Sequence, residues 1–130
     1  MKVIKNDCYG GFSLSYKAVM RYAELKGMTL YAFMPTSLRV YPPIPWNGVT
    51  KPPLGLLFYC TTRKYSEKTR FQLRKIRRTD PALVQTVKEL GKKANGKFAK
   101  LVIVEVPDGV KWEIRYNDGM ETIHEKHRTW

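Results

Sequence analysis

The chain has 130 residues, of which 43% are hydrophobic and 27% charged, a globular composition that excludes an intrinsically disordered protein. Its apolar stretches are far shorter than the roughly 20 residues that a membrane-spanning helix needs, so we expect no membrane partner. The formal net charge of +13, from 24 Lys and Arg against 11 Asp and Glu, favours an anionic partner.

The first residues, MKVIKND, contain no continuous apolar region and no cleavage site of the kind that marks a secretory signal. We therefore expect a cytoplasmic protein. In that compartment thiols stay reduced, so Cys8 and Cys60 are expected to be free and partly buried.

The first part of the chain predicts a strand followed by a helix. Residues 2–6 are rich in β-branched side chains and indicate a strand. Apolar residues then recur at helical spacing from Leu14 onward. Ser15 is a suitable N-cap and Gly27 a suitable end, so we predict a helix over residues 16–26.

A proline-rich segment, residues 36–53, separates two further predicted strands at 28–35 and 55–62. Each proline removes a backbone donor, so this segment does not fit the centre of a sheet. We interpret it as a loop or an irregular edge hairpin.

The second half begins with residues 70–76, where apolar and basic positions alternate, and this indicates a strand with a basic outward face. A helix is then clearly marked, with Asp80 as its N-cap, Pro81 as its first residue and Gly91 as its end.

The last part of the chain predicts a buried strand over 97–106 and a hairpin over 111–127 that turns at 117–119, although its last segment is also compatible with a helix. Two helices and five to six strands in a mixed or antiparallel sheet give an α+β fold. We expect residues 1–130 to form a single domain.

Gly10 and Gly11 form a turn ahead of the first predicted helix. Consecutive backbone N–H groups before a helix can bind a phosphate. The pattern is neither GxGxxG nor a P-loop, because no Gly-Lys-Ser/Thr follows it. Ser13 and Ser15 can also satisfy those N–H groups from within the chain. The residues favour a structural bend that borders a pocket over a phosphate loop.

The basic segment, residues 63–78, carries over half of the net charge in 16 residues, with Glu67 as its one acidic residue. Such runs are commonly solvated surfaces, but interleaved aromatic residues favour a nucleotide or nucleic-acid partner. Arg74 and Arg78 are suited to binding phosphate through two parallel hydrogen bonds. The eight basic residues are Arg63, Lys64, Lys68, Arg70, Arg74, Lys75, Arg77 and Arg78.

The C-terminal residues contain His124, His127, Arg128 and Trp130. Two histidines and a distant cysteine are too few for a zinc site, which needs three or four ligands, so we predict no metal. His127 and Arg128 can contact phosphate while Trp130 stacks on a base. The alternative is a surface tail in which Trp130 packs over the core.

The sequence contains no recognisable catalytic set. Cys8 and Cys60 have no histidine close to them in sequence, and the spacing of Glu113, Glu121 and Glu125 matches no known carboxylate pair. We therefore predict a protein without enzymatic activity and without a cofactor.

The segments CYGGFSLS, residues 74–114 and DGMETIHEKHRTW resemble a family of small proteins of tailed bacteriophages and prophages. The resemblance implies a phage or prophage origin and a location in the host cytoplasm, but no settled activity. It leaves the region 36–61 uncovered, and the family has more acidic residues around the last hairpin than IRYNDG. The matching positions are Tyr9, Gly10, Gly11, Phe12, Ser13, Ser15, Arg74, Ile76, Arg78, Asp80, Pro81, Trp112, Glu113, Asp118, Gly119, Glu121, His127, Arg128 and Trp130.

Together these features predict a non-enzymatic protein that captures an anionic nucleotide, acting as a counter-defence sponge for a host immune signal. The arginines and histidine would contact phosphates, and Tyr9 and Trp130 would stack on a base or close the pocket. The predicted binding residues are Tyr9, Gly10, Gly11, Arg74, Arg78, His127, Arg128 and Trp130.

Two alternatives stay open. One is a nucleic-acid-binding protein that uses the basic segment, with contacts from Arg63, Lys64, Lys68, Arg70, Lys75 and Arg77. The other is an inhibitor of a host defence protein that binds through the proline-rich loop around Trp46. Each of the three is compatible with an oligomer.

Overall fold

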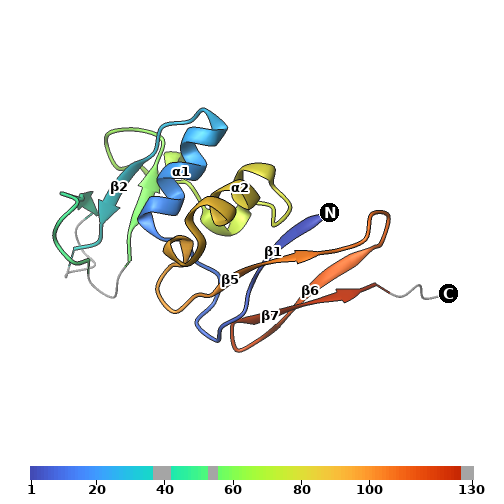
Figure 1. Ribbon diagram of the computed structural model, residues 1–130. Coiled ribbons are helices and arrows are strands. Elements are labelled where there is room, and N and C mark those ends of the chain that lie inside the picture. Colours follow the sequence, from blue (N-terminus) through green and yellow to red (C-terminus); the bar gives the residue numbers. More distant parts are fainter. Residues whose placement is uncertain (37–41, 53–55, 127–130) are drawn as a thin grey trace. The chain divides into compact units, whose positions relative to one another are not determined.

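The computed structural model describes residues 1–36, 42–52 and 56–126 (Figure 1). Within these ranges the chain forms two α-helices, α1 (Tyr16–Lys26) and α2 (Pro81–Leu90), and seven short strands, so the predicted α+β class is confirmed. The described elements also include the 3₁₀ helices η2 (Glu67–Thr69), η3 (Leu73–Lys75) and η4 (Gly91–Ala94). The strands are β1 (Lys2–Asn6), β2 (Tyr31–Met34), β3 (Ile44–Pro45), β4 (Phe58–Cys60), β5 (Leu101–Glu105), β6 (Trp112–Asn117) and β7 (Met120–Glu125).

Both predicted α-helices are confirmed, together with the residues that begin and end them. Ser15 Oγ accepts a hydrogen bond at 3.2 Å from a backbone N–H of the first turn of α1. Asp80 Oδ1 does the same for α2 at 2.9 Å. Gly27 and Gly91 follow the two helices with φ angles of 69° and 56°, in the left-handed region where glycine is favoured.

The described strands form three small antiparallel sheets, β1–β5, β3–β2–β4 and β6–β7, rather than the single sheet of five or six strands that we predicted. The outer edge of β1 shows why the sheets do not join there. The N–H of Ile4 donates to the backbone carbonyl of Arg78 at 2.8 Å, and the N–H of Asn6 donates to the carboxylate of Glu121 at 2.7 Å. A loop and a side chain therefore take the hydrogen bonds that a neighbouring strand would otherwise take.

By internal contacts the chain divides into two compact units. Unit 1 comprises Met1–Tyr22 and Leu73–Trp130, and unit 2 comprises Ala23–Gln72. The division falls inside the basic segment, after Gln72. The prediction that residues 1–130 fold as a single domain stays a prediction.

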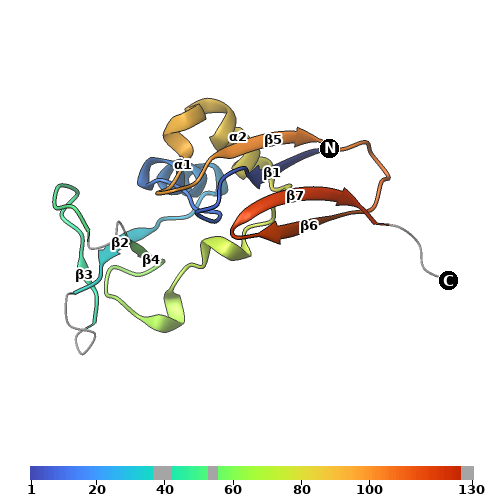
Figure 2. The ribbon, with the colours of Figure 1, turned by 90° about the horizontal axis from the view of Figure 1, so that it is seen from below.

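In unit 1, α2 packs on β1 and β5, and the β6–β7 hairpin lies beside β1 (Figures 1 and 2). The hydroxyl of Tyr22 donates to Asp80 at 2.8 Å, which ties α1 to the start of α2. Burial, together with this hydrogen bond, raises the pKa of Tyr22 above its ordinary value. The buried hydrophobic residues of the unit are Val3, Ile4, Leu14, Ala18, Val19, Tyr22, Ile76, Leu83, Val84, Val87, Ala94, Leu101 and Val106.

Unit 2 is built around β2, which lies between β3 and β4. Phe33 of β2 is buried and meets the ring of Tyr65 edge to face, with centroids 5.5 Å apart. β3 is a two-residue edge strand, as expected for a proline-rich segment. Residues 37–41 and 53 of that segment lie outside the described residues.

The strand predicted over 70–76 is wrong, because the structure has only an isolated bridge and a 3₁₀ helix there. Arg70 forms an isolated bridge with Cys60, and the N–H of Phe71 donates to the carbonyl of Tyr59 at 2.7 Å. β4 has only three residues, and the chain turns into η3 at Leu73 instead of continuing to pair.

The C-terminal hairpin is confirmed, with Asp118 and Gly119 at its turn. Both have positive φ, 50° and 88°, which is the pattern of a type I′ turn. The last segment is a strand as far as Glu125 and not a helix. The predicted buried strand 97–106 begins only at Leu101, because Phe98 has a φ of 63° that interrupts the extended chain, and residues 102–104 are half-buried.

Candidate functional site

Five of the eight residues predicted to bind an anionic ligand lie in the described part of the chain, and all five are in unit 1. Tyr9, Gly10 and Gly11 follow β1, Arg74 is exposed in η3, and Arg78 precedes α2. His127, Arg128 and Trp130 lie outside the described residues.

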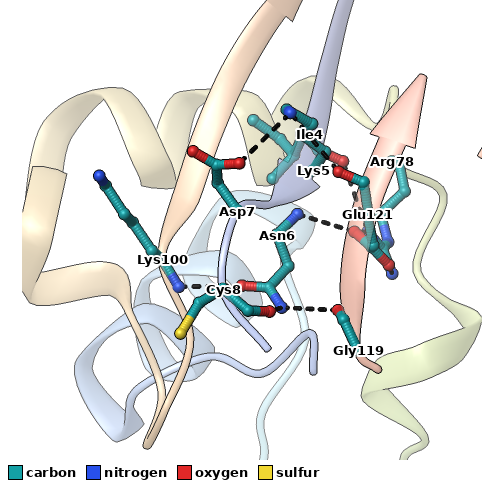
Figure 3. Close-up of polar contacts among 9 residues, drawn as sticks. All are labelled: Ile4, Lys5, Asn6, Asp7, Cys8, Arg78, Lys100, Gly119 and Glu121. Atoms are coloured by element: carbon teal, nitrogen blue, oxygen red, sulfur yellow. Dashed lines mark hydrogen bonds and ion pairs between the residues drawn. The ribbon is translucent and has the colours of Figure 1, made fainter. Parts of the chain in front are cut away.

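Arg78 is bound inside the protein by Glu121 of β7 (Figure 3). Its two terminal nitrogens donate to the two carboxylate oxygens, Nη1 to Oε1 and Nη2 to Oε2, the latter at 2.8 Å. The Glu121 side chain is 1% exposed and that of Arg78 is 12% exposed. The guanidinium carbon also lies 3.6 Å from the centre of the Phe12 ring. The charge of Arg78 is therefore matched within the fold.

Asn6 joins three chain segments at the end of β1 (Figure 3). Its Nδ2 donates to the carbonyls of Cys8 at 2.7 Å and Gly119 at 3.0 Å, and its Oδ1 accepts the N–H of Lys100 at 2.9 Å. The side chain is fully buried and uses both its donor and its acceptor groups. We did not single out Asn6 from the sequence, where a buried polar residue at a strand end gives no local signal.

The glycine turn has a packing role. A Cβ added at Gly10 would overlap the backbone of Phe98, and one added at Gly119 would overlap the backbone of Tyr9. The loop after β1 therefore lies in backbone contact with both the β6–β7 turn and the loop before β5. At the start of α1, the N–H of Ala18 donates to Ser15 Oγ, so a residue of the chain itself binds this donor.

The loop before β5 presents an exposed aromatic residue, Phe98, which has an unusual backbone conformation. The residue is 69% exposed and has a φ of 63°. The amine of Lys97 lies 5.3 Å from the centre of its ring. Tyr9, in the loop that packs against this one, is 62% exposed.

A second concentration of positive charge lies in unit 1 at residues 88–100, which we call the lysine segment. Its five lysines are exposed and form no ion pair with any described residue. Its one acidic residue, Glu89, is paired with Arg21 at 2.7 Å. Hydrogen bonds from Arg21 and Gln85 lower the pKa of Glu89 to about 2. The five are Lys88, Lys92, Lys93, Lys97 and Lys100.

The lysine segment was missed in the sequence because its lysines are spread over 13 residues and are interrupted by an α-helix end and a turn. A count of charge in windows of that length would have found it.

The basic segment is divided between the two units. In unit 2, Arg63 lies 6.0 Å from the ring centre of Tyr31 and Arg70 lies 4.0 Å from that of Phe58. Arg70 therefore has one face of its guanidinium covered within the unit, and Arg63 also donates from Nε to the hydroxyl of Tyr31 at 3.4 Å. Lys64 and Lys68 are exposed in unit 2, and Arg74, Lys75 and Arg77 are exposed in unit 1.

Comparison of the chain with protein-family models, with curated proteins and with solved structures gave no match. The resemblance to bacteriophage proteins stays a prediction. Among the described residues, no group of three or more His, Cys, Asp or Glu is placed to bind a metal ion, and both Cys8 and Cys60 are free thiols. No described helix has both the length and the apolar composition to cross a membrane.

Proposed function

We propose that the protein binds nucleic acid, and that the lysine segment supplies the main phosphate contacts. The observation that carries this proposal is the set of five exposed lysines that no described carboxylate neutralises. When exposed lysines neutralise the phosphates of a nucleic acid, they release the counterions that are condensed on it, and this release favours binding.

The backbone beneath these lysines is fixed, which favours a defined binding surface over a loose tail. The hydroxyl of Ser15 donates to the backbone carbonyl of Lys93 at 2.5 Å. The N–H of Ser15 donates to the carbonyl of Ala94 at 3.0 Å, and the N–H of Asp7 donates to that of Lys100 at 2.7 Å. The side chains of the five lysines are exposed to solvent.

Charge elsewhere in the chain supports the same proposal. Unit 2 contains seven basic and two acidic residues, so each unit carries a positive excess. In unit 1, Arg74, Lys75 and Arg77 are exposed and form no ion pair with a described residue. Positive charge of this extent also raises the rate of encounter with a polyanion.

The capture of a nucleotide, which the sequence first suggested, has less support from the geometry than nucleic-acid binding has. Its site needed Arg78, whose guanidinium is already bound by Glu121 and covered by Phe12. The nucleotide sponge stays a prediction that depends on Arg74, Tyr9 and the residues after 126. The alternative of an inhibitor of a host defence protein also stays a prediction. In the proline-rich loop on which it depends, the indole N–H of Trp46 donates to the carbonyl of Thr50 at 2.7 Å.

The proposal is tested by titrating labelled single-stranded and duplex oligonucleotides with the protein over a series of salt concentrations. We expect the binding affinity to fall steeply with salt. The slope of log affinity against log salt concentration should be about −0.7 per phosphate contact on a single strand and about −0.9 on a duplex. Fluorescence anisotropy reports the affinity directly. If the protein binds neither the single-stranded nor the duplex oligonucleotide at low salt, the proposal is overturned.

A further inference from the structure

We propose that Phe98 is a base-stacking residue and that the loop around it binds single-stranded nucleic acid, with Lys97 and Lys100 on the flanking phosphates. This inference rests on the proposed function and specifies its ligand. Three observations carry it: the conformation of Phe98, the way its loop is held, and the chemistry of its neighbours.

Phe98 adopts a backbone conformation that phenylalanine rarely occupies. With a φ of 63° it lies in the left-handed region, where a bulky side chain is disfavoured and glycine or asparagine is normally found. Strained residues of this kind persist where surrounding structure holds them, and they concentrate at functional sites. The ring itself is 69% exposed, so core packing does not account for the choice of residue.

The loop that carries Phe98 is held by backbone contacts on both sides. The N–H of Gly96 donates to the carbonyl of Ser13 at 3.1 Å, and Ser13 Oγ donates to the carbonyl of Lys97 at 3.3 Å. Gly10 lies against the backbone of Phe98 so closely that a Cβ there would overlap it. Because the backbone of this loop is already held, little backbone freedom is lost when the ring stacks on a base.

The neighbours of Phe98 have the chemistry that a single strand requires. The amine of Lys97 lies 5.3 Å from the ring centre, which places positive charge beside the stacking face. Lys100 has its backbone bound by Asn6 and its side chain exposed. Tyr9 offers a second exposed ring in the adjoining loop.

These features favour a single strand over a duplex. Stacking on a side chain needs an accessible base face, and in a duplex those faces are covered by neighbouring base pairs. Lysines alone would bind either form, as well as any other polyanion. The exposed ring is therefore the feature that discriminates.

The test compares Phe98→Gly with Phe98→Tyr in the full chain. Glycine suits the left-handed backbone, so Phe98→Gly should remain folded while it removes the ring, and thermal unfolding checks this. We expect it to weaken binding to a single strand by about 5- to 100-fold, and Phe98→Tyr to retain binding, because tyrosine also stacks. Phe98→Gly should bind a strand of abasic sites and a sulfated polysaccharide as tightly as the unmodified protein does, because neither ligand has a base on which the ring could stack.

The affinities are measured for a DNA strand and an RNA strand of the same sequence. Binding that depends on the Phe98 ring to either strand supports the proposal. The strand that binds more tightly identifies whether the ligand is DNA or RNA. If Phe98→Gly binds single strands as tightly as the unmodified protein does, the stacking role is overturned while nucleic-acid binding through lysines stands. If the unmodified protein binds no nucleic acid, both proposals fall.

Discussion

Asn6 and Glu121 are 115 residues apart in sequence, and the backbone N–H of the first donates to the carboxylate of the second at 2.7 Å. That carboxylate also binds both terminal nitrogens of Arg78. One buried side chain therefore closes the outer edge of β1 and fixes the residue that leads into α2. The stability of unit 1 should depend on it more than on any exposed ion pair described above.

Replacing Glu121 with alanine should lower the free energy of unfolding by about 3 to 5 kcal/mol, because Arg78 would be left as a buried charge without its partner. Urea unfolding followed by circular dichroism measures this loss. Glu113→Ala is the matched control, since its ion pair with Arg115 is exposed on the β6–β7 hairpin and should contribute less than about 1 kcal/mol. Equal losses in the two variants would contradict the structural role of Glu121.

Arg78→Lys should also destabilise the protein, by about 1.5 to 3 kcal/mol, because lysine cannot make both hydrogen bonds to Glu121 or lie flat against Phe12. Arg74→Lys serves as its control, because Arg74 is exposed and forms no ion pair with a described residue. Differential scanning calorimetry should show a shift for the first variant alone. A stable Arg78→Lys variant with impaired ligand binding would instead restore Arg78 as a phosphate-binding residue.

The two neighbouring glycines should respond differently to alanine. At Gly10 the added methyl group would overlap the backbone of Phe98, so we expect a loss of about 1 to 3 kcal/mol from overpacking. At Gly11 there is space, and the cost is the conformational one of a residue with a φ of 87°, about 1 kcal/mol. Chemical denaturation of both variants tests the difference, and a Gly10→Ala variant as stable as the unmodified protein would rule out the close contact.

The Arg21–Glu89 pair predicts a specific pH dependence. Because the pKa of Glu89 is lowered to about 2, its stabilising effect is present at neutral pH and is lost as the pH falls from about 5 toward 2, where the carboxylate takes up a proton. The stability difference between the unmodified protein and Arg21→Gln should therefore shrink over that range. Unfolding curves recorded across the range test it, and a difference that stays constant with pH would show that the pair contributes nothing through charge.

The helices and the final hairpin were predictable because their signals are local. Ser15 and Asp80 directly precede the helices that they cap. The backbone preferences of Asp118 and Gly119 alone indicate the turn of the hairpin. The separation of the β6–β7 hairpin from β1 was not predictable, since it depends on Glu121 facing inward from a strand. A glutamate at that position is normally expected in solvent.

The candidate site was predictable only in part, for related reasons. The positive charge and the turn at Gly10 and Gly11 could be inferred from composition and spacing. The pairing of Arg78 with Glu121 could not, because it joins residues 43 positions apart. Nor could the conformation of Phe98, whose loop contacts Gly10 and Ser13 of another segment of the chain.

The most direct test of the central claim compares two double variants in salt-dependent binding to a single-stranded oligonucleotide. One removes two charges of the lysine segment, Lys93→Ala with Lys97→Ala, and the other removes two exposed lysines outside it, Lys17→Ala with Lys111→Ala. We predict that the slope of log affinity against log salt becomes shallower by about 1.4 for the first pair and stays near the original value for the second. Equal slopes for the two variants would contradict a binding surface at the lysine segment.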